Sequence, residues 1–207
     1  MTGTQPSSER VPIALRGWLR ATSLGWLLGV PCILVLALVG EAIEIGGAQV
    51  LVGLGMGSAV GLLQGRAMRP VIGDAWPWVV ASGVGLALPF LVADIAALRE
   101  WELRYSLQWC VTIGGVIVGA WQALLLRARV HGTAWWLAAS ALGWTLAGAA
   151  ARAADALTGS ASARGIAGAL LFLAIVAAGG VVLGLVTGAA LPRLVPRGSG
   201  GRIAAEG

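Results

Sequence analysis

Six apolar runs of bilayer-spanning length recur along the chain, and they constrain its fold more than any other feature. They lie near residues 21–40, 46–65, 76–98, 106–126, 134–151 and 166–192. About 20 residues of helix cross a bilayer. Only 11% of the residues are charged, whereas about a quarter are charged in a soluble domain. The sequence therefore predicts an all-α integral membrane protein with six transmembrane helices.

The distribution of arginine predicts the orientation of these helices. Arginine supplies all 14 basic residues. Ten lie in the two tails and in the connections after the second and fourth runs: Arg10, Arg16, Arg20, Arg66, Arg69, Arg127, Arg129, Arg193, Arg197 and Arg202. The four on the opposite side are Arg99, Arg104, Arg152 and Arg164. The positive-inside rule then places both termini in the cytoplasm, as expected for a bacterial inner-membrane protein. Topology accounts for the basic charge, so we expect no nucleic-acid partner.

A helical motif is repeated along the chain. A shift of 58 residues places "GMGSAVGLLQGRAMR" (55–69) on "IGGVIVGAWQALLLR" (113–127), and a looser copy is "GGVVLGLVTGAALPR" (179–193). The same shift places "WVVASGVGL" (78–86) on "WLAASALGW" (136–144), with a further copy in "WLRATSLGW" (18–26). Each unit is thus a pair of helices, and the three units occupy about 18–69, 78–127 and 136–194.

Three tandem hairpins in one orientation are parallel repeats. They predict a six-helix transmembrane domain over 17–194, between disordered cytoplasmic tails at 1–16 and 195–207. Two arrangements satisfy this pattern, a pseudo-threefold ring and a sequential row of hairpins. The motifs resemble those of bacterial multipass membrane proteins that repeat a Gly-rich "GxxQ…LR" helix and a "WWxxAxxLGW" helix. The resemblance covers about residues 18–194 and implies the fold without an activity. The third unit departs from it at Thr187 and Pro192.

The second helix of each unit carries glycines at every fourth position, which form a stripe on one face. We expect the stripes to be packing faces and these three helices to form the close-packed centre of the bundle, because small residues let helices approach in lipid. The glycines are Gly57, Gly61, Gly115, Gly119, Gly180 and Gly184.

Polar residues recur at one depth near the cytoplasmic side. They are Gln64, Gln122 and Thr187 in the second helices, and Thr22, Ser82 and Ser140 in the first helices. A buried amide is costly unless it is hydrogen-bonded. We therefore interpret this layer as interhelical hydrogen bonding; the alternative is a polar constriction in a conduction path.

Tryptophans near the predicted ends of the runs suggest an interfacial aromatic belt. We assign to it Trp18, Trp76, Trp78, Trp135 and Trp136 on the cytoplasmic side and Trp101 and Trp109 on the outer side. The deeper Trp26, Trp121 and Trp144 are interpreted as packing residues. Cys32 and Cys110 are interpreted as small buried side chains.

Three function classes compete. A scaffold or accessory subunit would pack against partner membrane proteins or a second copy within the lipid bilayer. A small channel or transporter would place its pathway near the Gln64, Gln122 and Thr187 layer. An intramembrane enzyme is disfavoured, because the chain has a single histidine and no lysine, P-loop or HExxH motif. We expect no cofactor or metal, and we favour the scaffold because the runs hold few polar residues.

Overall fold

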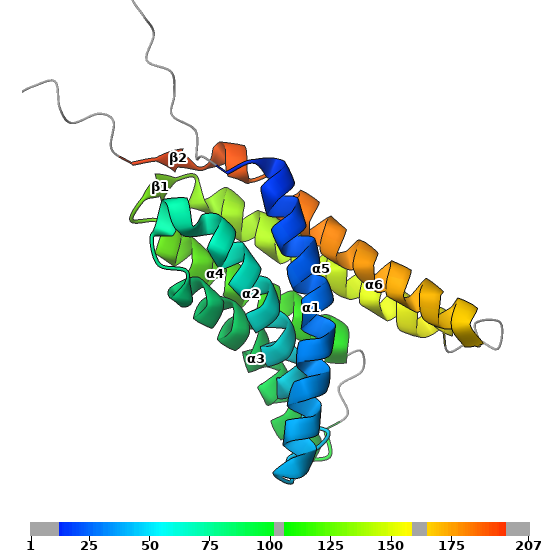
Figure 1. Cartoon of the computed structure of the whole chain (residues 1–207). Coiled ribbons are helices and arrows are strands. Elements are labelled where there is room, and N and C mark those ends of the chain that lie inside the picture. Colours follow the sequence, from blue (N-terminus) through cyan, green and yellow to red (C-terminus); the bar gives the residue numbers. More distant parts are fainter. Residues whose placement is uncertain (1–12, 102–105, 159–164, 198–207) are drawn as a thin grey trace, which may run out of the picture.

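The computed structural model describes residues 13–101, 106–158 and 165–197 (Figure 1). Its helices are α1 (Leu15–Ala42), α2 (Val50–Ile72), α3 (Trp76–Leu98), α4 (Ser106–Leu126), α5 (Thr133–Thr158) and α6 (Gly165–Gly188). A short 3-10 helix, η1 (Leu191–Arg193), and two strands, β1 (Val130–His131) and β2 (Val195–Pro196), complete the described elements. We call α1, α3 and α5 the first helices, and α2, α4 and α6 the second helices, of their units.

The described part of the chain is an all-α membrane protein by length and hydropathy. Helices α1 to α4 and the segment Gly165–Arg193 are each long and apolar enough to cross a membrane. Helix α5 is 26 residues long but is not among these candidates, and it carries Arg152 and Asp155 near its end. The predicted ranges 76–98 and 106–126 coincide with α3 and α4.

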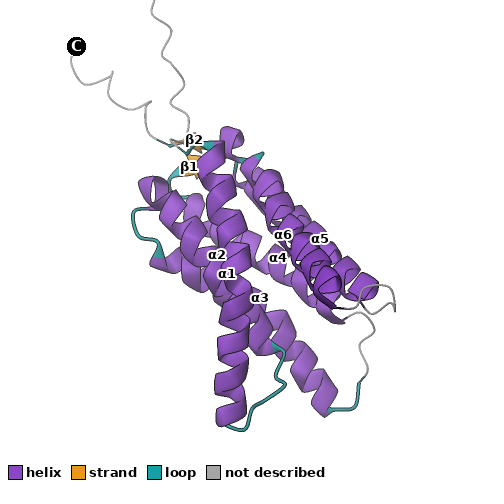
Figure 2. Ribbon diagram, turned by 45° about the vertical axis from the view of Figure 1, so that its right-hand side comes forward, coloured by secondary structure: helices purple, strands orange, loops and turns teal. Residues whose placement is uncertain are grey.

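The six helices form a closed ring in sequence order. Each helix packs mainly against its neighbours in the chain, and α6 returns to pack against α1. This closure selects the pseudo-threefold arrangement over a sequential row. The ring is tight at the end that holds β1 and β2, whereas α5 and α6 lean away from the other helices at the opposite end (Figure 1, Figure 2).

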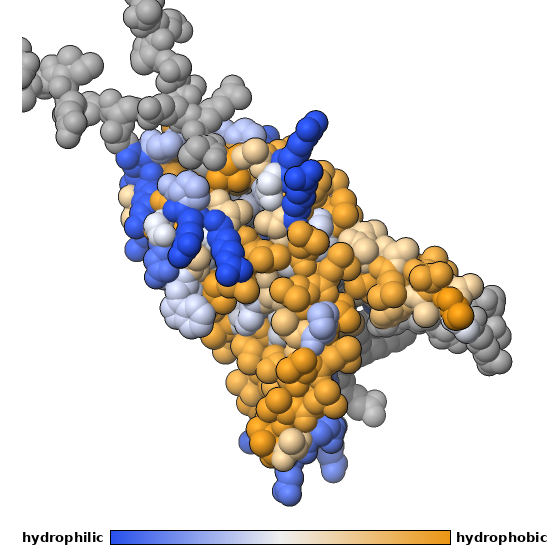
Figure 3. All heavy atoms as spheres, viewed as in Figure 1, coloured by the Kyte–Doolittle hydropathy of each residue, from blue (hydrophilic) through white to orange (hydrophobic). Residues whose placement is uncertain are grey.

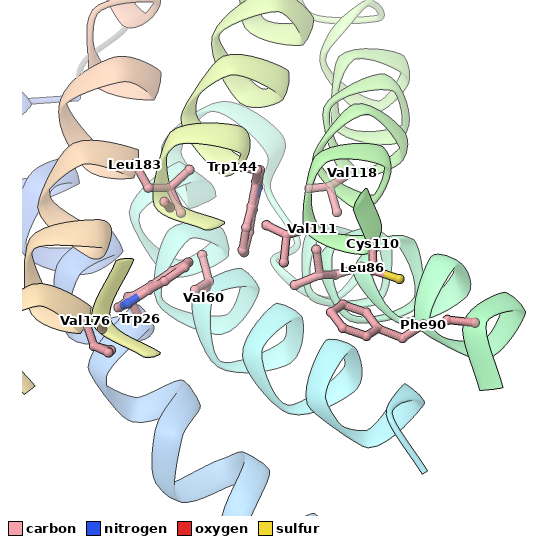
Figure 4. Close-up of a cluster of buried hydrophobic side chains, with 13 residues drawn as sticks. Trp26, Val60, Leu86, Phe90, Cys110, Val111, Val118, Trp144, Val176 and Leu183 are labelled. Carbon is pink, nitrogen blue, oxygen red and sulfur yellow. The ribbon is translucent and has the colours of Figure 1, made fainter. Parts of the chain in front are cut away.

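Side chains at equivalent positions of the three units fill the ring in layers. Next to the polar residues, one layer holds Val60, Val118 and Leu183, and the next holds Trp26, Leu86 and Trp144. Figure 4 shows these two layers converging between the helices. On the other side of the polar residues, Met68, Leu126 and Leu191 are buried with three more tryptophans, described below. The core therefore repeats the threefold pattern of the sequence.

The glycine stripes join one unit to the next. A Cβ atom at Gly61 of α2 would lie 2.6 Å from the Ser82 Cβ of α3. The equivalent contact joins Gly119 of α4 to Ser140 of α5, at 2.7 Å. At these distances a side chain on the glycine would force the backbones apart.

The third copy of this contact closes the ring. A Cβ atom at Gly184 of α6 would lie 3.3 Å from the Thr22 Cβ of α1 and 2.8 Å from Leu19 Cδ1. The neighbouring glycines of the stripes follow the same pattern: Gly57 meets the Ser82 carbonyl, Gly115 meets Trp144, and Gly180 meets Trp26. The expectation that the three second helices form the centre is wrong. They alternate with the first helices around the ring, because each glycine face is occupied by the first helix of the next unit.

A second set of glycines joins the two helices within each unit. Gly25, Gly85 and Gly143 of the first helices meet Val60, Val118 and Leu183 of the second helices, respectively. Small residues therefore lie at both kinds of helix contact. Because the three units share these contacts, the hairpins and the joints between them have a common geometry.

One end of the ring is closed by polypeptide outside the long helices. Strand β1, in the α4–α5 connection, pairs antiparallel with β2, which follows α6. The Arg129 guanidinium donates to the Ile72 carbonyl at the end of α2. The backbone N–H of Arg197 donates to the backbone carbonyl of Arg129 at 2.7 Å. The predicted tail boundaries are therefore too wide. Helix α1 begins at Leu15, within the expected tail 1–16, and residues 195–197 belong to this closure. Residues 1–12 and 198–207 of the two tails lie outside the described residues.

The outer surface matches a bilayer environment. Hydrophobic residues form a broad band over the helices, and hydrophilic residues gather at the two ends (Figure 3). Exposed apolar side chains in this band include Leu34 and Leu38 of α1, Val92 of α3, and Leu170 of α6. Such exposure would be unfavourable in water and is typical of helices in lipid.

Substitution within a glycine stripe should destabilise the ring. We expect Gly61→Leu or Gly119→Leu to lower the free energy of unfolding by about 1–3 kcal/mol, because the added atoms overlap Ser82 or Ser140. Thermal unfolding in mild detergent measures the effect. Gly17→Leu is the matched control, since nothing lies within 4 Å of a Cβ atom at Gly17. Equal tolerance of all three substitutions would contradict the assigned packing.

Candidate functional site: a buried polar layer

The structure brings the six polar residues of the repeated motifs together inside the ring. Thr22, Gln64, Ser82, Gln122, Ser140 and Thr187 are each at most 3% exposed. They are the buried polar residues of the described chain. Each lies on the inner face of its helix because the repeat places it beside a glycine or a tryptophan that packs inward.

Hydrogen bonds join the two helices of the first and second units. Gln64 Nε2 donates to Thr22 Oγ1 at 3.2 Å, which connects α2 to α1. The equivalent bond runs from Gln122 Nε2 to Ser82 Oγ at 2.9 Å and connects α4 to α3. The Ser82 hydroxyl in turn donates to the Trp78 carbonyl at 2.8 Å. The amides therefore satisfy part of their hydrogen-bonding capacity inside the ring, as buried amides require.

A second set of bonds joins one unit to the next. Trp136 Nε1 donates to Gln122 Oε1 at 3.0 Å, and Trp18 Nε1 donates to Thr187 Oγ1 at 2.9 Å. The second of these bonds lies at the closure between α1 and α6. The Thr187 hydroxyl itself donates a hydrogen bond to the Leu183 carbonyl at 2.6 Å. The polar layer and the glycine stripes thus stabilise the same joints.

Ser140 takes a different partner from Ser82. Its hydroxyl donates to the Gly115 carbonyl of α4 at 3.2 Å. Thr187 cannot replicate the glutamine side chain here, because a hydroxyl is shorter and has no amide N–H to donate. The departure of the third unit from the repeated motif therefore changes the local hydrogen bonds while keeping the residue buried.

Three tryptophans that we expected in an interfacial belt lie inside the ring. Trp18, Trp78 and Trp136 are at most 1% exposed. Trp136 makes edge contacts with Trp18 and Trp78, with ring centroids 5.3 and 5.4 Å apart. These indoles fill the centre beside the polar layer, so the belt assignment is wrong for them.

The remaining tryptophans divide differently. Trp76, Trp101, Trp109 and Trp135 are more than half exposed, as expected for a belt. Trp26 and Trp144 are buried with their centroids 5.8 Å apart. Trp121 is 36% exposed, so its interpretation as a packing residue is wrong. Helical phase provides the missing signal. Trp18, Thr22, Gly25 and Trp26 share the i, i+4, i+7, i+8 face that is buried in α1.

One link in the pseudo-threefold pattern is incomplete. By the equivalence of the units, Trp78 Nε1 should donate to Gln64 as Trp136 Nε1 donates to Gln122. Instead, Trp78 Nε1 is buried with no hydrogen-bond partner. The joint between the first and second units therefore lacks a bond that the other two joints have.

Asp94 and Cys110, near the end of the ring opposite β1 and β2, have structural contacts. Asp94 of α3 accepts hydrogen bonds from the Gln49 and Val50 N–H groups, both at 2.8 Å. A carboxylate at this position stabilises the N-terminus of α2. The thiol of buried Cys110 donates to the Pro89 carbonyl at 3.4 Å, and Cys32 is half-buried. Sequence reasoning missed the Asp94 cap, because Asp94 lies 45 residues from Gln49 in the chain.

The chemistry of the layer is that of neutral hydrogen bonding. Its six side chains are amides and hydroxyls, and aliphatic and aromatic layers enclose them on both sides. Such groups orient and join helices without changing charge.

Comparison of the chain with protein-family models, curated proteins and solved structures finds no match.

The incomplete link supports a matched pair of substitutions. Trp136→Phe removes an indole N–H that is hydrogen-bonded, whereas Trp78→Phe removes one that has no partner. We expect Trp136→Phe to be more destabilising by about 0.6–2 kcal/mol, the usual contribution of a hydrogen bond in a membrane protein. Thermal unfolding of both variants measures the difference. Equal destabilisation would mean that the bond to Gln122 contributes nothing.

Proposed function

We propose that the protein is a scaffold or accessory subunit of the bacterial inner membrane that acts by packing its helices against partner membrane proteins. The observation that carries this proposal is the filled centre of the ring. Trp18, Trp78 and Trp136 occupy it at one level, the hydrogen-bonded polar layer occupies the next, and aliphatic side chains occupy the level beyond that. The proposal assigns the chain no catalytic step, cofactor or metal.

The second candidate function, a channel or transporter with its pathway at Gln64, Gln122 and Thr187, is less well supported. A pathway needs polar groups that face a water-filled axis. The Gln122 amide N–H instead donates to the Ser82 hydroxyl, and the Gln122 amide oxygen accepts from the Trp136 N–H. Movement of a solute through this layer would require breaking both bonds and displacing buried indoles.

We further propose that all six helices cross the membrane, with both termini on the cytoplasmic side. The β1–β2 pairing and the Arg129 contact with Ile72 support this topology by bringing the ends of α2, α4 and α6 together. Among the described arginines, Arg16, Arg20, Arg66, Arg69, Arg127, Arg129, Arg193 and Arg197 belong to this end, and Arg99 and Arg152 to the other. Helix α5 must then run from this end to the other, because α6 returns from there.

Cysteine labelling tests the topology. In a Cys32→Ala, Cys110→Ala background, we expect Asp74→Cys and His131→Cys to be protected from a membrane-impermeant reagent added outside. Trp101→Cys, in an exposed position beyond α3, should be labelled. Labelling of position 74 or 131 from outside would contradict the six-span topology with cytoplasmic termini.

The two candidate functions differ in the effect of Gln122→Leu. As part of a packing layer, Gln122 should contribute about 1–3 kcal/mol to the free energy of unfolding, since its loss removes two hydrogen bonds and leaves the Trp136 N–H unpaired.

The scaffold proposal also predicts a partner. Purification of the wild-type chain from native membranes in mild detergent should recover a second membrane protein in a fixed ratio with it. An unrelated tagged six-span protein is the control.

The opposite result is equally specific. Suppose that the wild-type chain carries a solute flux in proteoliposomes, and that Gln122→Leu abolishes this flux without changing the thermal stability. That result would support the channel and contradict the scaffold. Recovery of the chain alone from native membranes, under conditions that keep known complexes intact, would also contradict it.

A further inference from the structure

A groove of about 310 Å³ lies between α5 and α6 near the β1–β2 end. Ala138, Ala139 and Leu142 of α5, Val186 of α6, and Ala189 just beyond the end of α6 line it. Its small side chains leave a depression on a surface that we place in the bilayer. Trp135 lies at the mouth of the groove, and Leu142 lies seven residues further along α5. At a rise of 1.5 Å per residue, the two positions are about 10 Å apart along the helix axis. The groove thus stays within one leaflet, which is about half of the 30 Å hydrocarbon core.

A cation is fixed at the mouth of the groove. The Arg193 guanidinium lies 4.5 Å from the centroid of the Trp135 ring, and its Nη1 donates to the Ala189 carbonyl at 2.9 Å. A guanidinium has five N–H donors, so this bond leaves donors for another ligand. Arg193 and Trp135 are both exposed. A cation stacked on an aromatic ring loses less conformational freedom when it binds an anion.

The surrounding charge favours an anion. Seven further arginines belong to this end of the described chain, and Asp74 is its only acidic residue. The Asp74 carboxylate already accepts the Trp76 N–H at 3.0 Å. A basic pocket between helices at the membrane surface is the kind of site that binds anionic lipid headgroups.

We propose that this groove binds one anionic phospholipid, with an acyl chain between α5 and α6 and the phosphate on Arg193. Lipid chemistry fits both halves of the site, since the lining is apolar and the mouth is cationic at headgroup level. A second protein helix would fit less well, because it would bury the Arg193 charge in an apolar contact. The site does not depend on the scaffold proposal, because lipid binding and partner binding are measured separately.

Native mass spectrometry of the delipidated protein tests the site. The purified chain in mild detergent is titrated with phosphatidylglycerol or with phosphatidylcholine of the same acyl chains. We expect the first bound lipid to be phosphatidylglycerol. Arg193→Gln should weaken that binding about fivefold, which corresponds to the usual contribution of one basic residue at a membrane surface. Ala138→Phe should weaken it as well by filling the groove.

Controls distinguish a site from general attraction to the basic end. Arg69→Gln removes an exposed arginine from the same end but not from the groove, so it should leave the first binding step unchanged. Glycerophosphate, which has the phosphate without the chains, should not compete. Each variant is used only where its thermal unfolding matches that of the wild type, and Ala138→Leu replaces Ala138→Phe if the latter fails to fold.

Three results would overturn the proposal. Equal binding of the two lipids would remove the role of charge. An equal loss in Arg69→Gln and Arg193→Gln would indicate a diffuse electrostatic layer. Full binding by a folded Ala138 variant with a filled groove would show that the acyl chain lies elsewhere.

Discussion

Close approach of a glycine face to the next first helix is the contact on which the ring depends. In lipid, helices gain little from hydrophobic burial, so van der Waals contact between closely approaching backbones must supply much of the association. Gly61, Gly119 and Gly184 allow that approach at three equivalent joints. The third joint pairs the last helix with the first, and this closure converts three tandem hairpins into one body.

The closed ring leaves an interior that must be filled, and the repeat supplies the filling in layers. Indoles from the three first helices occupy one level, the amides and hydroxyls the adjoining level, and aliphatic side chains the next. The polar level adds direction to the packing, because Trp136–Gln122 and Trp18–Thr187 form only when the helices have one register. The same residues therefore fix the helix register and fill the axis, which is why we favour a packing role over conduction.

Much of this structure follows from the sequence, and the failures have physical causes. The shift that aligns Gly57 with Gly115 predicts the hairpins, and motif spacing predicts which polar residues share a depth. Composition alone could not distinguish a Trp at a helix end that faces lipid from one that faces inward. Trp135 and Trp136 are adjacent, yet one is 56% and the other 1% exposed, since neighbouring residues differ by about 100° around a helix. The Asp94 cap and the β1–β2 pairing depend on contacts between distant segments, which the repeat does not encode.

Ring closure between α1 and α6 is the central claim, and a disulfide tests it most directly. A Cβ atom at Gly184 would lie 3.3 Å from the Thr22 Cβ, close to the 3.5–4.5 Å range of disulfides. In a background without Cys32 and Cys110, the Thr22→Cys, Gly184→Cys double variant should form an intramolecular disulfide on mild oxidation in native membranes. Gel mobility before and after reduction measures it, with each single variant as control. Absence of that crosslink in folded protein would contradict the closed ring.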